Sequence, residues 1–183
     1  MSTYNVLVLS LQKDKERRKQ TNAILFNLGI GFKYFDAVTP DKLSYYQKEI
    51  FFKDLDHNPN VNREAVMATF ISHLEILKTI FNSKTNTLLL EDDLVPARDF
   101  DFKNVDFDTF GVKQLMSEVS CCSQFYNWKE AGEIFWHLTS IFPTQAFDWE
   151  LHKLRSKFNI QTVDEPVFTQ STHFVSNIAP NGY

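Results

Sequence analysis

Three leucines at residues 88–90 run directly into three consecutive carboxylates, Glu91, Asp92 and Asp93. A short apolar run that follows the polar residues 83–86 is typical of a buried parallel strand, so we expect the acids at its carboxyl end. Open α/β sheets bind ligands at that edge. Adjacent acids also repel one another unless a cation or a proton relieves the repulsion. The pattern therefore favours a ligand or metal site, with a solvated loop that is acidic by chance as the alternative.

Length, charge and cysteine usage exclude several classes of protein. The chain has 183 residues, enough for one full core, and we expect residues 1–183 to form a single domain. Its net charge is -4 and the basic cluster at residues 13–19 is interrupted, which argues against nucleic-acid binding. The sequence has no transmembrane or signal pattern, so we expect a soluble, unprocessed protein. Cys121 and Cys122 are adjacent, which disfavours an ordinary disulfide and favours a reducing, cytoplasmic location.

Glycine is scarce in this chain. Only five glycines occur, and none forms a Gly-x-Gly-x-x-Gly motif or a P-loop. Gly29 and Gly31 follow a helical pattern rather than a strand. A ligand that carries phosphate would therefore need another partner, and a metal ion held by carboxylates is one physical alternative.

The first part of the chain predicts a β-α-β unit. Residues 4–9 form an apolar strand pattern, and a charged helix follows whose Ile24, Leu25 and Leu28 we expect to face inward until Gly29 ends it. A second strand is predicted at residues 32–35, with Asp36 at its end. This order predicts an α/β sheet.

In the rest of the chain, the hydrophobic patterns that predict helices and strands are clear in some segments and absent in others. A long helix is predicted at residues 63–81, and its expected buried stripe is Met67, Phe70, Ile71, Leu74, Leu77 and Ile80. Residues 147–158 favour a helix, residues 160–163 a strand and residues 168–183 a polar tail. Residues 111–137 show no clear period.

Eight short segments carry a resemblance to glycosyltransferase family 25, which includes bacterial lipooligosaccharide galactosyltransferases and collagen galactosyltransferases. In the family's order they are residues 6–11 (VLVLSL), 16–18 (ERR), 28–30 (LGI), 35–38 (FDAV), 68–73 (ATFISH), 90–93 (LEDD), 147–149 (FDW) and 166–171 (PVFTQS). The fifth resembles the family's Ser-His helix, the sixth its acidic metal motif and the seventh its Asp-Trp element.

The resemblance implies a GT-A fold, a Rossmann-like mixed sheet flanked by helices. It also implies an inverting hexosyltransferase that moves galactose or glucose from a UDP-sugar to a glycan hydroxyl, as in lipooligosaccharide biosynthesis. The implied cofactor is a divalent cation, usually manganese. The implied partners are the nucleotide-sugar donor and the glycan acceptor, with peripheral membrane contact also compatible with the sequence.

The same resemblance assigns the metal ligands. Glu91 and Asp93 are the natural pair, because residues two apart on a strand point the same way. Asp92 would then face the ribose of the donor or brace its neighbours. His173, in the carboxyl-terminal region, is the candidate to complete the metal shell, and an exposed tail histidine is the alternative.

The catalytic base is expected in the Asp-Trp element. Asp148 is the first candidate, since a carboxylate within reach of the acceptor hydroxyl suffices, and Glu150 is the second. The alternative for Asp148 is an acid that stabilises the start of the helix. Trp149 would offer a sugar-stacking face if exposed, whereas Trp128 and Trp136 are interpreted as core.

The remaining donor-binding candidates lie near the amino terminus and on the long helix. Ser10 and Leu11 belong to the opening motif. Arg17 or Arg18 would reach the diphosphate, with one of the two expected on a solvated helix face. The two further candidates are Asp36, for the base or ribose, and His73, beside the donor or as a satisfied helix histidine.

Some residues depart from the family's pattern. Val66 stands where an acid usually precedes the Ser-His helix, residues 176–178 read Ser-Asn-Ile instead of Ser-Asp-Ile, and residues 124–132 do not match the usual Gly-Thr-x-Ala-Tyr segment. A degenerate relative that binds a nucleotide sugar or a partner protein is therefore the alternative function. A metal-dependent phosphotransferase would use the same acids, but the chain lacks the Asp-x-Asp nucleophile order with a downstream Lys and Asp constellation that we would expect of one.

Overall fold

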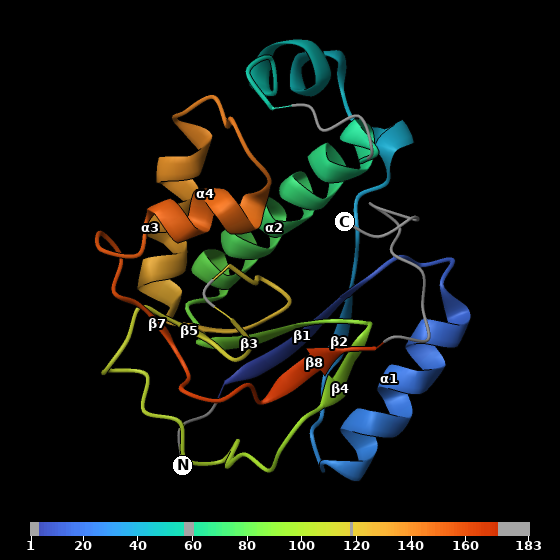
Figure 1. Ribbon diagram of the computed structural model, residues 1–183, viewed down its shortest axis with the longest axis vertical. Helices are drawn as coiled ribbons and strands as arrows, with labels where there is room; N and C mark the ends of the chain where they lie inside the picture. The colour runs from blue at the N-terminus through green and yellow to red at the C-terminus, as the bar shows by residue number, and fades with distance from the viewer. Residues whose placement is uncertain (1–3, 57–60, 118, 172–183) are drawn as a thin grey trace.

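The computed structural model describes residues 4–56, 61–117 and 119–171 (Figure 1). The described elements are β1 (Asn5–Ser10), α1 (Lys15–Asn27), β2 (Lys33–Asp36), α2 (Arg63–Ser83), β3 (Thr87–Glu91), β4 (Leu94–Pro96), β5 (Val112–Gln114), β6 (Ser123–Tyr126), α3 (Trp128–Thr139), α4 (Phe147–Lys153), β7 (Ile160–Thr162) and β8 (Phe168–Gln170). Short helical turns lie at Pro40–Lys42 and Gln47–Phe51.

Six of the strands form one mixed sheet, in the order β2-β1-β3-β6-β5-β7. Strand β1 runs parallel to both β2 and β3, which confirms the β-α-β unit predicted from the sequence. Strand β6 runs antiparallel to β3 and β5, and β7 returns parallel to β5. Strands β4 and β8 pair as a separate two-stranded antiparallel sheet.

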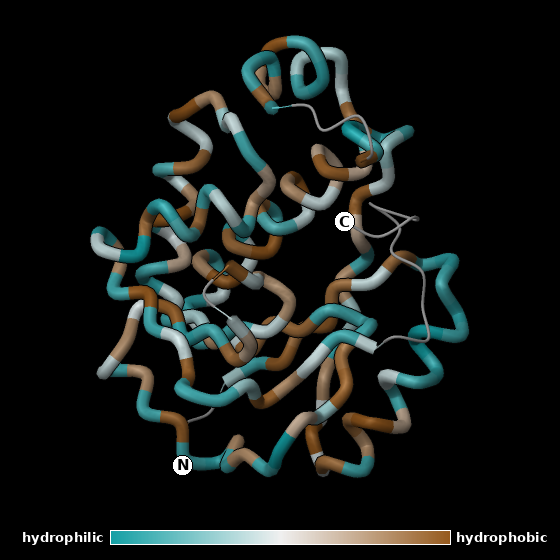
Figure 2. The backbone as a smooth tube through the Cα atoms, in the orientation of Figure 1, coloured by the Kyte–Doolittle hydropathy of each residue, from teal (hydrophilic) through white to brown (hydrophobic). Residues whose placement is uncertain are grey.

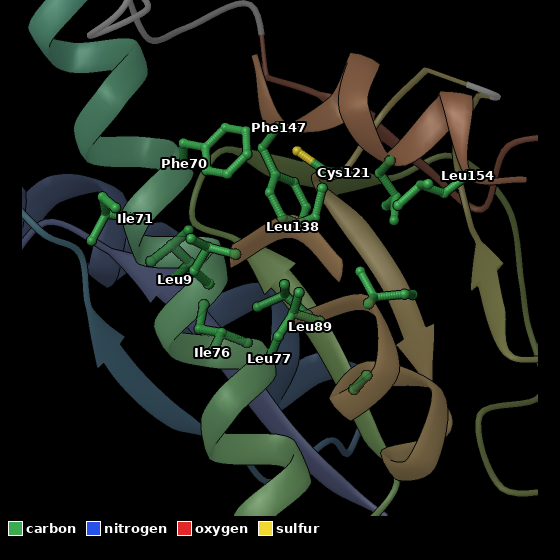
Figure 3. Close-up of a cluster of buried hydrophobic side chains, with 14 of the residues drawn as sticks. Leu9, Phe70, Ile71, Ile76, Leu77, Leu89, Cys121, Leu138, Phe147 and Leu154 are labelled. Atoms are coloured by element: carbon green, nitrogen blue, oxygen red, sulfur yellow. The ribbon is translucent and has the colours of Figure 1, made fainter. Parts of the chain in front are cut away.

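Alternating side chains of the central strands enter two different cores. Leu9 and Leu89 pack with α2, α3 and α4, and Figure 3 shows both beside Ile76 and Leu77 of α2. Val8, Leu88 and Leu90 belong to the second core, which includes Leu25 of α1. Because both faces of these strands are covered, their sequences are continuously apolar rather than alternating.

Helix α2 follows its sequence pattern closely. Asn62 begins it, and its side-chain oxygen accepts a hydrogen bond from the Ala65 amide at 3.1 Å. All six residues of the expected stripe are buried. Figure 1 shows α2 with α3 and α4 on one side of the sheet, away from α1.

Helix α1 is less buried than expected. Only Thr21 and Leu25 are buried on it, and its charged start is coloured as hydrophilic in Figure 2. Leu28 is 37% exposed, so the expectation that it faces inward is wrong. Gly29 follows with a φ of +67°, the left-handed conformation that commonly ends a helix.

Three other expectations are corrected. The helix predicted at residues 147–158 ends at Lys153. Residues 168–170, expected in a polar tail, form β8 and pair with β4. Trp136, expected in the core, is 62% exposed on α3. In the part of the chain that the structure describes, no helix is both long and apolar enough to span a bilayer.

Candidate active site

The acidic run lies at the carboxyl edge of the parallel strands. Strand β3 ends at Glu91, Asp92 and Asp93 form the turn that follows, and β4 begins at Leu94. Ser10 of β1 pairs with Asp36 of β2 at the same edge. The position predicted for the acids is therefore confirmed, and strands β1, β2 and β3 all contribute a polar residue to it.

Neighbouring side chains of the protein hydrogen-bond to Asp92. Its carboxylate accepts a hydrogen bond from the Ser10 hydroxyl at 2.6 Å and another from the Arg17 guanidinium at 3.1 Å. The Thr21 hydroxyl donates to the backbone carbonyl of Asp92 at 3.0 Å. Burial raises the pKa of Asp92, and the bonds from Ser10 and Arg17 oppose that rise. These contacts suit the bracing role considered for Asp92.

Asp93 has a different environment. Its Oδ1 atom is buried, and no described residue hydrogen-bonds to it. Its Oδ2 atom lies 3.7 Å from the Arg17 guanidinium. Burial, together with the nearby charge of Glu91, raises the pKa of Asp93 to about 6. A buried carboxylate oxygen without a partner is costly, and a cation or a proton would satisfy it.

Glu91 contacts the histidine of α2. His73 Nε2 lies 3.3 Å from Glu91 Oε1, and the imidazole stacks on the Phe147 ring with centroids 4.4 Å apart. Burial opposes the ionisation of Glu91, but the interactions with His73, Cys122 and Arg17 together outweigh it and lower the pKa of Glu91. Glu91 is therefore the readily ionised acid of the pair, beside the harder-to-ionise Asp93.

Both arginines of α1 point into the site. The Arg18 guanidinium donates to the Ser10 hydroxyl at 3.0 Å and to Asp36 at 2.5 Å, and it lies 4.4 Å from the centroid of the Tyr34 ring. The side chains of Arg17 and Arg18 are 12% and 19% exposed. The expectation that one of them decorates a solvated face is wrong, because the acids at the sheet edge pair with both.

The two candidate bases, Asp148 and Glu150, both lie on α4 but have different surroundings. Asp148 lies in its first turn and accepts a hydrogen bond from the Trp149 amide at 3.0 Å. Burial raises the pKa of Asp148, and the adjacent Phe147 ring stacks on His73, which places Asp148 beside this site. Trp149 itself is 47% exposed, as a sugar-stacking residue requires.

Glu150 is engaged elsewhere. Its Oε1 atom accepts hydrogen bonds from the amides of Thr144 and Gln145, at 2.9 and 3.0 Å, and from the Lys153 ammonium at 2.9 Å. These bonds satisfy the backbone at the start of α4. The geometry therefore favours Asp148 over Glu150 as a group free to act on a substrate.

Two further residues belong to the site, and one candidate cannot be placed. Thr21 lies one helical turn from Arg17, a spacing that the sequence could have revealed. Cys121 lies 3.6 Å from His73 Nε2, and no sequence pattern connects the two. Leu11 directly follows Ser10, and its backbone carbonyl accepts from the Ser10 hydroxyl at 3.3 Å. His173 lies outside the described residues.

A solved structure of low sequence identity shares this fold. GlyE, a glycosyltransferase of Streptococcus pneumoniae TIGR4, aligns with a TM-score of 0.52 at 13% identity, over 89% of this chain and 46% of its own. The chain thus spans about half the length of GlyE. A glycosyltransferase involved in glycosylation of the major capsid of PBCV-1 aligns with a TM-score of 0.47 at 12% identity, over 91% of this chain and 92% of its own.

The sequence matches a family of glycosyltransferases over most of its length. No curated protein matches the chain by sequence. The model of glycosyltransferase family 25, described as an LPS biosynthesis protein family, matches residues 3–159, which include every candidate site residue named above except His173. The chain therefore belongs to glycosyltransferase family 25.

Proposed function

We propose that this glycosyltransferase moves a hexose, galactose or glucose, from a UDP-sugar to a hydroxyl of a glycan acceptor, as in lipooligosaccharide biosynthesis. The fold is proposed to be of GT-A type and the reaction to invert the anomeric carbon. One observation carries the proposal: the buried Asp93 Oδ1 atom, which has no hydrogen-bond partner among the described residues, lies beside Glu91, whose pKa is lowered, at the edge where parallel strands end.

The residues present fit a divalent cation. Glu91 and Asp93 offer the oxygen ligands that manganese and magnesium prefer, and Asp92 is already engaged by Ser10 and Arg17. A cation held there would neutralise the charge that develops on the diphosphate leaving group. His173 remains a proposed additional ligand.

The other residues of the site support donor and acceptor positioning. Arg18 hydrogen-bonds to Ser10 and to Asp36 at the end of β2, and this polar group would bind the ribose or the base of the donor. Arg17 balances the charges of Asp92 and Asp93. Asp148, near Glu91 and only partly paired, would accept the proton of the acceptor hydroxyl.

The first experiment measures UDP binding by calorimetry with manganese and with excess chelator. We expect chelation to weaken binding by at least about 10-fold, because the chain has no glycine phosphate loop to replace the cation. Asp93→Asn should show the same loss in the presence of manganese. Asp99→Asn, which removes an equal charge from an exposed residue, should not.

Unchanged UDP affinity in chelator would overturn the metal role and leave the arginines as the diphosphate ligands. Manganese-dependent binding with no transfer to any glycan would instead favour the degenerate relative. The two failures are thereby distinguished.

A further inference from the structure

Three different ligand atoms converge behind the acidic turn. His73 Nε2 comes from α2, Glu91 Oε1 from the end of β3, and Cys121 Sγ from the segment before β6. The nitrogen lies 3.3 Å from the oxygen and 3.6 Å from the sulfur, and the sulfur lies 4.0 Å from the oxygen. Figure 3 shows Cys121 beside Phe147, the ring on which His73 stacks.

These separations resemble the edges of a tetrahedral zinc site. Zinc bond lengths to nitrogen, oxygen and sulfur give ligand-to-ligand edges of about 3.3–3.6 Å. Two of the three separations fall in that range, and the sulfur-to-oxygen separation is longer by about 0.5 Å. Glu91 has the most exposed side chain of the three, at 21%, so a small rotation of its carboxylate can close that edge.

We propose that His73, Glu91 and Cys121 form a zinc-binding site whose fourth position opens on the side of Glu91. A thiolate and an imidazole favour zinc over manganese, which prefers oxygen ligands. This site is thus chemically distinct from the cation site proposed at Glu91 and Asp93, although it shares one carboxylate. Its binding can be measured without any donor, so it does not rest on the proposed function.

Binding exchanges a proton for the metal. The Cys121 thiol loses its proton to solvent as the zinc–sulfur bond forms, and the neutral imidazole coordinates through Nε2 with its proton on Nδ1. The thiolate and the Glu91 carboxylate then balance the two charges of zinc. No atom is oxidised or reduced.

The surroundings set the expected strength of the site. His73 is fully buried and held by the Phe147 stack, so its ring is already oriented. Its Nδ1 atom has no hydrogen-bond partner among the described residues, whereas ligating histidines usually donate that proton. Such a partner is worth roughly 10–100-fold in metal affinity. We therefore expect reversible binding, weaker than that of a closed structural zinc site.

Cobalt(II) titration of the reduced protein tests this inference. We expect a one-to-one complex with a thiolate-to-cobalt charge-transfer band that zinc abolishes by displacement. The band should be lost in Cys121→Ser and retained in Cys122→Ser, the matched change at the neighbouring thiol, whose sulfur instead contacts Gln170. His73→Gln should weaken binding by at least 10-fold.

X-ray absorption of the wild-type zinc complex provides a test that needs no variant to fold. One sulfur scatterer at about 2.3 Å, with the rest of the shell nitrogen or oxygen, is the expected result. A shell without sulfur, binding that stays substoichiometric, or a charge-transfer band that follows Cys122 and not Cys121 would overturn the proposal.

Discussion

The three neighbouring acids of the site have three different environments. Glu91 contacts His73, Asp92 accepts from Ser10 and Arg17, and one oxygen of Asp93 has no partner among the described residues. Removing each charge should therefore have a different effect. At Asp92 the loss would leave buried donors unsatisfied, whereas at Asp93 it would relieve a repulsion.

Asp148→Asn tests the proposed base. The amide keeps the shape of the side chain but cannot accept a proton, so we expect transfer to fall by roughly 100-fold or more while UDP affinity stays unchanged. Stability should change little, because the amide oxygen can still accept from the Trp149 amide. Turnover, donor affinity and melting temperature are measured on the one variant.

Glu150→Gln is its control. We expect this variant to keep most of its transfer activity and to lose only about 1 kcal/mol of stability, since its amide oxygen can still accept the hydrogen bonds from Thr144, Gln145 and Lys153 but without the charge that strengthens them. If Asp148→Asn lowers only the melting temperature and leaves transfer intact, Asp148 has a helix-stabilising role.

At the scale of single residues, the sequence predicted the acids but not their partners. Three consecutive carboxylates after an apolar strand are visible in the sequence. That Glu91 and Asp93 act as a metal-binding pair stays a prediction, because β3 ends at Glu91 and strand alternation does not extend to Asp92 and Asp93 in the turn. The pairing of His73 with Cys121 spans 48 residues, and only the strand order brings the two together.

At the scale of elements, long periodic segments were predictable and short polar ones were not. Helix α2 carries a full apolar stripe, whereas β6 is four residues long and buries Ser123 and Gln124. Buried polar residues conceal a strand pattern, because the usual alternation is absent. Asn127 begins α3 with a side-chain bond to the Lys129 amide, a capping signal that the region's irregular pattern obscured.

Helices α2 and α3 pack closely at one glycine, which gives a prediction at this scale. A Cβ atom on Gly132 would lie 2.2 Å from the Phe81 ring, too close for any side chain to fit without a shift. We expect Gly132→Ala to cost about 1–3 kcal/mol of unfolding free energy, measured by chemical denaturation.

Gly31→Ala is the matched control, since a Cβ atom there meets nothing within 4 Å. It should be neutral or slightly stabilising, because alanine restricts the unfolded chain. Equal effects of the two substitutions would show that helix packing at Gly132 does not limit stability.

At the scale of the whole molecule, the fold gathers the acidic turn, α1, α4 and the last described strand at one edge. The Ser171 amide, just after β8, donates to the Asp93 carbonyl at 2.6 Å. A polar tail was expected there, because a three-residue strand such as β8 is too short to show a strand pattern in the sequence. Its pairing with β4 is visible only in the structure. The mixed α/β class followed from the β-α-β order, whereas the antiparallel β6 required tertiary pairing to be recognised.

The ionisation of Asp93 at this edge should change the stability of the protein as pH changes. Burial and the charge of Glu91 raise the pKa of Asp93 to about 6, above its usual value of 3.8. A raised carboxyl pKa means that folding favours the protonated form. The contribution of Asp93 to the free energy of unfolding therefore falls as pH rises from about 4 through about 6, by about 3 kcal/mol in total.

Asp93→Asn, which stays neutral, should remove that loss. We expect its melting temperature without divalent cations to exceed that of the wild type by roughly 5–10 °C at pH 7, and by little at pH 4. Manganese should reverse the order at pH 7, because it stabilises only the chain whose Asp93 can ionise. Asp99→Asn serves as the control, since it changes the net charge equally from an exposed position. If the difference in melting temperature between the wild type and Asp93→Asn does not change between pH 4 and 7, the pKa of Asp93 is not raised in the folded protein.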